Sequence, residues 1–264
     1  MSDFSIAEHN GYRYVDEGPA TSAPPVVLLH GMLGDQSNWY ATIRDLAKKQ
    51  YRVIVPVLPV YDLPLSQTTV PGLVDYVHGF TEALGIPEMV LAGNSLGGHV
   101  ALLYAVRHPE KVSALVLSGA SGIYEVEMGT SKFRRRDRDY IRQRAALTFF
   151  DPAHATDDLV EDVYGIINDR GRAIRLIRMA RSVQNEGVAE HLGTIHAPTL
   201  LVWGEEDVIT PPDVAEAFFE GIPNARLQFI GKCGHAPMIE HPDVFNEYTL
   251  EFLDEVSGKL KMAM

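Results

Sequence analysis

The sequence predicts an α/β fold, in which helices cover both faces of a mostly parallel central sheet and a helical cap is inserted into the chain. Short apolar runs rich in β-branched residues alternate with longer segments whose apolar residues recur at helical spacing. One long stretch between two of these runs contains helical patterns without a convincing strand. Strand and helix in alternation are typical of a parallel sheet that is covered on both faces.

The expected elements follow one another along the chain in that alternation. We expect strands at Val26–Leu29, Arg52–Val55, Met89–Ala92, Ala114–Leu117, Thr199–Val202 and Leu227–Ile230. We expect helices at Trp39–Lys48, Gly72–Leu84, Leu96–Arg107 and Asp243–Val256. With 264 residues, 46% of them hydrophobic, the chain can bury the core of one large domain with an insertion.

Residues 122–196 break the alternation. From Gly122 to His196 the sequence is charged and helix-like. A crossover between parallel strands ordinarily needs little more than about a dozen residues, so this stretch is too long to be one. We therefore predict a core domain formed by residues 1–121 and 197–264, and a helical cap formed by residues 122–196.

Composition narrows the possible partners and the cellular location. The formal net charge is −12, from 35 acidic and 23 basic residues. Nucleic-acid-binding proteins carry basic surfaces, and a negative net charge also disfavours contact with anionic lipid. The single cysteine, Cys233, cannot form an internal disulfide, and the first residues lack a signal-peptide pattern. We expect a cytoplasmic protein that acts on a small molecule, with no nucleic-acid or membrane partner. Composition leaves open whether it is a monomer or a homo-oligomer.

Ser95 stands in a cluster of small residues where an expected strand gives way to an expected helix. Glycine weakens both elements, so glycines on both sides of the serine indicate a turn that needs space. The stretch GNSLG, residues 93–97, matches the G-x-S-x-G pattern, in which a strained turn presents the serine hydroxyl. Because ligands bind at the carboxyl ends of parallel strands, we predict Ser95 as a nucleophile rather than as part of a structural turn.

A serine hydroxyl needs a base that takes its proton and an acid that orients the base. We predict His235 as the base, because it follows an expected strand in a glycine-containing loop. We predict Asp207, just past another expected strand, as the acid; Glu206 is its main competitor, with Glu205 beside it. Cys233 is close to the base, but we interpret it as a small buried side chain rather than a thiol nucleophile or redox switch.

A tetrahedral intermediate also needs N–H donors for its oxyanion. The G-x-S-x-G turn supplies the backbone N–H of Leu96, and the turn HGMLGD supplies that of Met32. We expect His30, in the same turn, to orient the loop rather than to transfer protons. The mechanism requires no cofactor and no metal, and we expect neither.

In this order along the chain, the motifs HG-x-x-G, G-x-S-x-G, the acid and GH resemble the α/β-hydrolase superfamily over essentially the whole chain. The segments GNSLGG and CGHAPMIEHPDVFN are similar to the branch that contains carboxylesterases and the meta-cleavage-product hydrolases, which split carbon–carbon bonds. The resemblance implies a sheet of about eight strands with a cap over the active site. A serine at position 95 disfavours the relatives that use aspartate, the haloalkane dehalogenases and epoxide hydrolases.

The sequence departs from the carbon–carbon hydrolases at substrate-binding positions of that branch. The resemblance implies Asn before the serine, which Asn94 supplies, but also Trp after the histidine and Arg on a cap helix; this chain has Ala236 and Val163 there. Three cap arginines remain alternative donors: Arg142, Arg144 and Arg178. The segment RVIVPVLPVYDLPLS lacks the D-x-P-G-x-G-x-S run common in relatives, so we expect the loop near Pro59–Leu65 to shape the pocket differently.

We therefore predict a serine hydrolase that cleaves a small-molecule carboxylic ester through an acyl-enzyme. Carbon–carbon hydrolysis is the alternative, and a ligand-binding sensor on a hydrolase fold is another. We expect six residues to line the substrate pocket: Gly31, Asn94, Phe149, Val163, Val208 and Ala236.

Overall fold

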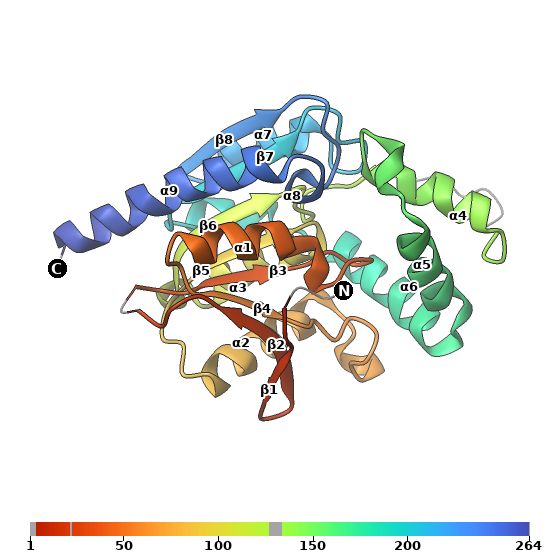
Figure 1. Ribbon diagram of the computed structural model, residues 1–264, viewed down its shortest axis with the longest axis horizontal. Coiled ribbons are helices and arrows are strands. Elements are labelled where there is room, and N and C mark those ends of the chain that lie inside the picture. Colours follow the sequence, from red (N-terminus) through yellow and green to blue (C-terminus); the bar gives the residue numbers. More distant parts are fainter. Residues whose placement is uncertain (1–3, 22, 127–133, 264) are drawn as a thin grey trace.

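A computed structural model describes residues 4–21, 23–126 and 134–263, and at its centre lies an eight-stranded sheet (Figure 1). Six strands pair in parallel, in the order β4-β3-β5-β6-β7-β8. They are β3 (Val26–Leu29), β4 (Val53–Pro56), β5 (Met89–Asn94), β6 (Val112–Ser118), β7 (Thr199–Gly204) and β8 (Ala225–Ile230). All six expected strands are confirmed, with ends that differ by at most 2 residues.

The other two strands form an N-terminal hairpin that the sequence analysis missed. β1 (Ala7–His9) pairs antiparallel with β2 (Tyr12–Glu17), and β2 pairs antiparallel with β4. Asn10 and Gly11 connect the two strands with φ angles of 49° and 82°. Two such residues in a row make the turn that Asn-Gly favours in two-residue hairpins. The dipeptide was the available signal, because both strands are too polar to stand out as apolar runs.

Alternate side chains of the parallel strands pack on opposite faces of the sheet. In β3, Val27 and Leu29 belong to one buried cluster, whereas Val26 and Leu28 belong to the other. The first face is covered by α2 (Val70–Ala83), α3 (Leu96–Arg107) and α7 (Pro212–Gly221). The second face is covered by α1 (Tyr40–Lys48), α8 (Pro237–Glu240) and α9 (Pro242–Ala263). Burial on both faces explains why these strands are continuous apolar runs in the sequence.

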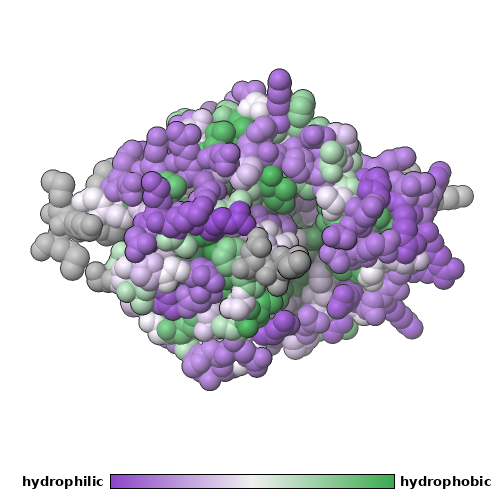
Figure 2. Space-filling model, viewed as in Figure 1, coloured by the Kyte–Doolittle hydropathy of each residue, from purple (hydrophilic) through white to green (hydrophobic). Residues whose placement is uncertain are grey.

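Among the described residues between β6 and β7, three α-helices occur: α4 (Arg138–Ala145), α5 (Asp157–Asn168) and α6 (Arg170–Asn185). The described part of residues 122–196 contains no strand, as expected. Thr156 and Asp169 cap the N-termini of α5 and α6, because their side chains accept hydrogen bonds from backbone N–H groups of the first turn. The three helices extend beyond one end of the sheet, and their visible surface is mostly hydrophilic (Figures 1 and 2). The division into two domains stays a prediction, and we call residues 122–196 the helical insertion.

The two ends of the insertion meet beside α3. The Val188 N–H donates to the Gly122 carbonyl over 2.8 Å. His99 of α3 is buried next to this contact, with Nε2 2.6 Å from the Glu186 carbonyl oxygen. The part of the chain that the structure describes also contains six short 3₁₀ segments: η1 (Gln36–Trp39), η2 (Leu65–Gln67), η3 (Pro109–Lys111), η4 (Ala146–Thr148), η5 (Pro152–His154) and η6 (Ala189–Thr194). Across the described residues, no helix is long and apolar enough to cross a bilayer.

Candidate active site

Ser95 forms the turn between β5 and α3 in a left-handed backbone conformation. Its φ is 55° and its ψ is −120°, a strained combination that costs a non-glycine residue roughly 1–3 kcal/mol. Flanking glycines make the turn possible, because a Cβ at Gly93 would overlap the backbone of Gly97 and one at Gly97 that of Leu29. The Ser95 N–H donates to the Ser118 carbonyl over 3.1 Å and fastens the turn to β6. The predicted strand, turn and helix around Ser95 are confirmed.

The Asn94 side chain joins the Ser95 turn to the loop that carries His235. Asn94 is buried, and its Nδ2 donates to the carbonyl oxygens of Ser118 (3.0 Å) and His235 (2.9 Å). The amide therefore holds residues from three strand ends at fixed positions. Whether Asn94 also contacts substrate stays a prediction.

His235 and Asp207 form a buried pair. His235 Nδ1 lies 2.8 Å from Asp207 Oδ2, and both side chains are almost fully buried. The carboxylate also accepts the backbone N–H groups of Ile209 (2.8 Å) and Thr210 (3.0 Å) and the Thr210 hydroxyl (2.9 Å). A carboxylate only accepts, so Nδ1 of His235 carries the proton and Nε2 keeps its lone pair. The pair thus presents a histidine whose free nitrogen can take a proton.

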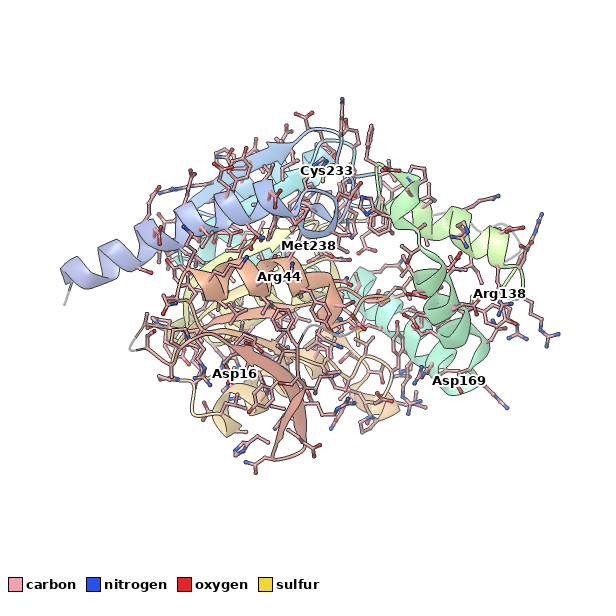
Figure 3. The ribbon with its side chains drawn as sticks, viewed as in Figure 1. Asp16, Arg44, Arg138, Asp169, Cys233 and Met238 are labelled. Atoms are coloured by element: carbon pink, nitrogen blue, oxygen red, sulfur yellow. The ribbon has the colours of Figure 1, made fainter. Side chains whose placement is uncertain are left out.

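Glu206, the competing acid in the sequence, is committed elsewhere. Its Oε2 accepts the Cys233 N–H over 3.0 Å, and the side chain is exposed. Cys233 is fully buried, in the same apolar cluster as Met238 of α8 (Figure 3). Burial, followed by the charge of Glu240, raises the pKa of the Cys233 thiol, so a reactive thiolate is disfavoured.

A second carboxylate acts on His235. Burial by itself lowers the pKa of His235, but the charge and hydrogen bond of Asp207, together with the charge of Glu125, raise it above 6.5 overall. The Ser121 hydroxyl donates to the Glu125 carboxylate, in the loop after β6. No motif in the sequence marks Glu125, and it is not among the predicted site residues.

The loop after β3 is clamped by His30. Leu58 donates its N–H to His30 Nε2 (3.2 Å), so Nδ1 is the protonated nitrogen and donates to the Gly31 carbonyl (2.9 Å). Burial lowers the pKa of His30, which keeps the ring neutral. The Met32 N–H belongs to the same rigid peptide as the Gly31 carbonyl and points the opposite way. This loop lies against Ser95, since a Cβ on Gly31 would be 3.3 Å from Ser95 Cβ.

Leu96 is the first residue of α3. The first N–H groups of a helix have no partner within it, and the aligned peptide dipoles favour negative charge at that end. The Leu96 N–H directly follows Ser95 and has no acceptor within the helix. The roles of the Leu96 and Met32 N–H groups stay predictions.

The helical insertion contacts the histidine loop directly. The His235 N–H donates to the Thr148 carbonyl (2.8 Å) in η4. Glu240 accepts the N–H of Gly234 through Oε1 and that of Phe150 through Oε2, each over 2.7 Å. One α8 carboxylate thereby fastens the insertion to the loop that carries His235.

The remaining pocket candidates lie in different surroundings. Phe149 is partly buried against the cluster that α8 and α9 cover, and Ala236 is buried within that cluster. Val163 packs inside the helical insertion, among its own apolar side chains. Val208, beside Asp207, is 47% exposed. Their contact with substrate stays a prediction.

Gly119 is a site residue that sequence reasoning missed. It has φ +52°, and a Cβ there would lie 2.8 Å from His235 Nδ1. No local motif marks it, because its need to be glycine comes from a ring more than a hundred positions away in the chain.

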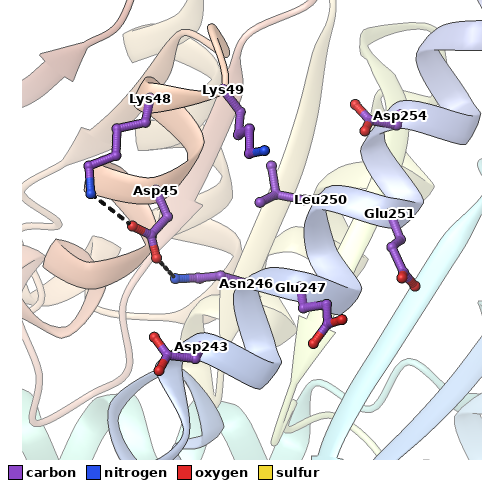
Figure 4. A pocket seen from close by; sticks show the side chains of 9 residues that line it. All are labelled: Asp45, Lys48, Lys49, Asp243, Asn246, Glu247, Leu250, Glu251 and Asp254. Carbon is purple, nitrogen blue, oxygen red and sulfur yellow. Dashed lines mark hydrogen bonds and ion pairs between the residues drawn. The ribbon is translucent and has the colours of Figure 1, made fainter.

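A surface pocket between α1 and α9 lies apart from these residues (Figure 4). It is lined by Asp45, Lys48, Lys49, Asp243, Asn246, Glu247, Leu250, Glu251 and Asp254. None of them belongs to the predicted site. Among the described residues, no group of three or more His, Cys, Asp and Glu side chains is arranged to hold a metal ion.

Comparisons with known proteins identify the family of the chain. A model of the alpha/beta hydrolase family matches residues 26–248. The chain is 30% identical over 250 residues to a 2-hydroxy-6-oxononadienedioate/2-hydroxy-6-oxononatrienedioate hydrolase of Comamonas testosteroni, covering 86% of this chain and 87% of the relative.

Solved structures resemble the chain along its length. An alpha/beta hydrolase enzyme from a lagoon-sediment metagenome of Mar Chica, Morocco, is 33% identical with a TM-score of 0.78, covering 95% of this chain and 98% of the other. A meta-cleavage product hydrolase of Pseudomonas fluorescens IP01 is 27% identical with a TM-score of 0.78, covering 95% and 97%.

Gly119→Ala should displace the His235 ring, because the new methyl carbon would lie only 2.8 Å from Nδ1, closer than a side-chain carbon can approach. We expect a fluorophosphonate probe to modify Ser95 about a hundredfold more slowly, without loss of the fold. The control is Gly165→Ala on α5, where a Cβ meets nothing within 4 Å. Equal rates of Ser95 modification in the two variants would show that the position of the His235 ring does not depend on a glycine at position 119.

The rate of the same reaction should rise with pH through a midpoint above 6.5, because His235 accepts a proton only when neutral and its pKa is raised. Glu125→Gln removes one of the raising charges, so its midpoint should move to lower pH. Glu205→Gln, an exposed change in the loop after β7, is the control and should leave the midpoint in place. A midpoint that Glu125→Gln does not move would remove Glu125 from the site.

Proposed function

Because the chain belongs to the alpha/beta hydrolase family, we propose that it is a serine hydrolase of carbon–carbon bonds in 2-hydroxy-6-oxo-dienoates. The observation that carries the proposal is the similarity to relatives named for such substrates, together with a histidine and aspartate pair beside a strained serine. This reverses the preference of the sequence analysis, which placed ester hydrolysis first. The relatives favour the stated alternative.

In the proposed mechanism Ser95 is the nucleophile. His235 takes the hydroxyl proton on Nε2, and Asp207 holds the ring in the tautomer that leaves this nitrogen free. Attack on the substrate carbonyl carbon creates an oxyanion, which the N–H groups of Leu96 and Met32 stabilise. Such a donor is worth about a hundredfold or more in rate.

Carbon–carbon cleavage adds one step before this attack and one after it. The dienol must first move its hydroxyl proton to the carbon beside the distant carbonyl, which makes that carbon a leaving group. When the tetrahedral intermediate collapses, the bond between the two carbons breaks and its electron pair delocalises into the dienolate, which takes the proton from His235. Water, deprotonated by His235, then releases the acyl group from Ser95.

Binding the substrate carboxylate needs a cationic donor, and we propose Arg144. Val163 and Ala236 offer none. Arg142 is bonded to the Ala155 carbonyl and to Asp157, and Arg178 is exposed. Arg144 of α4 is partly buried, four residues before Thr148, whose carbonyl accepts the His235 N–H. Arg144 therefore belongs to the segment of the insertion that approaches the site.

Ester hydrolysis remains the second candidate, for a specific reason. The apolar side chains at Val163 and Ala236 offer no hydrogen bond to a dienoate, and an ester needs no prior proton shift. The same serine, histidine and N–H groups would serve its single oxyanion.

A direct comparison of two substrates tests the proposal. On 2-hydroxy-6-oxo-6-phenylhexa-2,4-dienoate we expect kcat/KM at least about a hundredfold above that on p-nitrophenyl butyrate, or roughly 2.7 kcal/mol of transition-state binding. Ser95→Ala should abolish both activities. A higher kcat/KM on the ester would promote the second candidate, and dienoate turnover that survives Ser95→Ala would refute the mechanism.

Arg144→Ala should raise KM for the dienoate and leave the ester unaffected, since only the dienoate carries a carboxylate. Arg138→Ala on the same helix is the control, because Arg138 is exposed and pairs with Glu161. Equal effects of the two variants would exclude Arg144 as the carboxylate donor.

Asp207→Asn should lower kcat by about ten-thousandfold, the cost of the corresponding exchange in a serine protease, because an amide favours the wrong imidazole tautomer. Glu206→Gln should keep kcat within about twofold, since its side chain still has an oxygen to accept the Cys233 N–H. A large loss in Glu206→Gln with little loss in Asp207→Asn would exchange their roles.

A further inference from the structure

The loop that follows β4 lies between the Ser95 site and the helical insertion. This is the segment, near Pro59–Leu65, in which the sequence lacks the run common in relatives. Two contacts join it to the loop after β3: the Leu58 N–H donates to His30 Nε2 (3.2 Å), and the Tyr61 hydroxyl donates to the Met32 carbonyl. Both acceptors flank the peptide that carries the Met32 N–H.

Two further contacts join the same segment to the insertion. Arg175 Nε of α6 donates to the Leu63 carbonyl over 2.8 Å. The Tyr61 ring is half-buried and packs both against the main core and against the insertion cluster that contains Val163. Burial raises the pKa of Tyr61, so its hydroxyl stays a donor across the physiological range. One side chain thus contacts the core, the insertion and the loop after β3.

The backbone at Met32 is determined by these contacts. Its preceding peptide is held by His30 through the Gly31 carbonyl, and its following peptide is held by Tyr61 through the Met32 carbonyl. Peptide units are rigid planes joined by two soft dihedrals at each residue. Anchoring the planes on both sides of Met32 therefore fixes its φ and ψ, and with them the direction of its N–H.

We propose that Tyr61 is a positioning residue that holds the Met32 N–H toward the oxyanion and couples this donor to the seating of the helical insertion. The inference rests on the proposed function, in which the Met32 N–H binds the oxyanion. Tyr61 touches neither the substrate carbonyl nor Ser95 in this role. It acts through Met32, so its loss weakens the transition state more than the bound ground state.

Tyr61→Phe is the informative variant, because it keeps the ring packing and removes only the hydroxyl. With a fluorophosphonate probe we expect the maximal rate of Ser95 modification to fall about tenfold while the half-saturating concentration stays unchanged, since a loosened donor costs less than a lost one. The matched control is Tyr76→Phe, another half-buried tyrosine in this region, whose hydroxyl is 3.3 Å from the Val57 carbonyl oxygen. It should keep both parameters.

Arg175→Ala tests the connection to the insertion. It removes the bond to Leu63 and leaves the Tyr61 hydroxyl in place, so we expect a smaller fall in the maximal rate. The double variant Tyr61→Phe with Arg175→Ala should lose less than the product of the single losses, because both changes release the same backbone. Multiplicative losses would show that the two residues act independently and would refute the coupling.

The outcomes separate this inference from the proposed function. If Ser95 in the unaltered chain is modified and Tyr61→Phe matches Tyr76→Phe, the positioning role is wrong and the hydrolase proposal stands. A change in half-saturation alone would also refute the positioning role. If Ser95 in the unaltered chain is not modified at all, the proposed function fails and the inference fails with it.

Discussion

Ser95 has a left-handed backbone conformation that the glycines beside it make possible. The other residues of the site are arranged around this turn. In this turn the backbone approaches Gly93 and Gly97 so closely that neither residue could carry a side chain. The turn also needs β6 beside it, because the Ser95 N–H bonds to Ser118. The parallel sheet supplies this neighbour, since the carboxyl ends of its strands lie at one edge.

The groups around Ser95 reach the same edge of the sheet from several strands. His30 and Met32 follow β3, Asp207 follows β7 and His235 follows β8. Asn94 then fastens the end of β5 to both β6 and the His235 backbone. A shift of one strand would therefore move its own group away from the others, so the precision of the site depends on the buried sheet.

Local sequence was sufficient for the parts of the site that motifs define. Glycine spacing predicted the turn at Ser95, and apolar runs predicted the parallel strands of the core. The pairing of Asp207 with His235 followed from the order of motifs, although the sequence could not exclude Glu206. The hairpin was missed because its strands are short and polar, and only its Asn-Gly turn carried a signal.

What the sequence could not predict depends on contacts between distant segments. Gly119 matters because of the His235 ring, Glu125 because of its charge near that ring, and Tyr61 because of the Met32 carbonyl. The choice of substrate lies in the same category. It depends on which side chains of the helical insertion face Ser95, and no spacing rule fixes that.

The proposed function depends on one arrangement: Ser95 as nucleophile with two backbone donors for the oxyanion. A crystal structure of the chain after reaction with a fluorophosphonate tests it most directly. We expect phosphorus bonded to Ser95 Oγ, with the phosphoryl oxygen about 2.7–3.1 Å from both the Leu96 and the Met32 nitrogens. Phosphorus on another residue, or a phosphoryl oxygen that turns away from these two N–H groups, would contradict it.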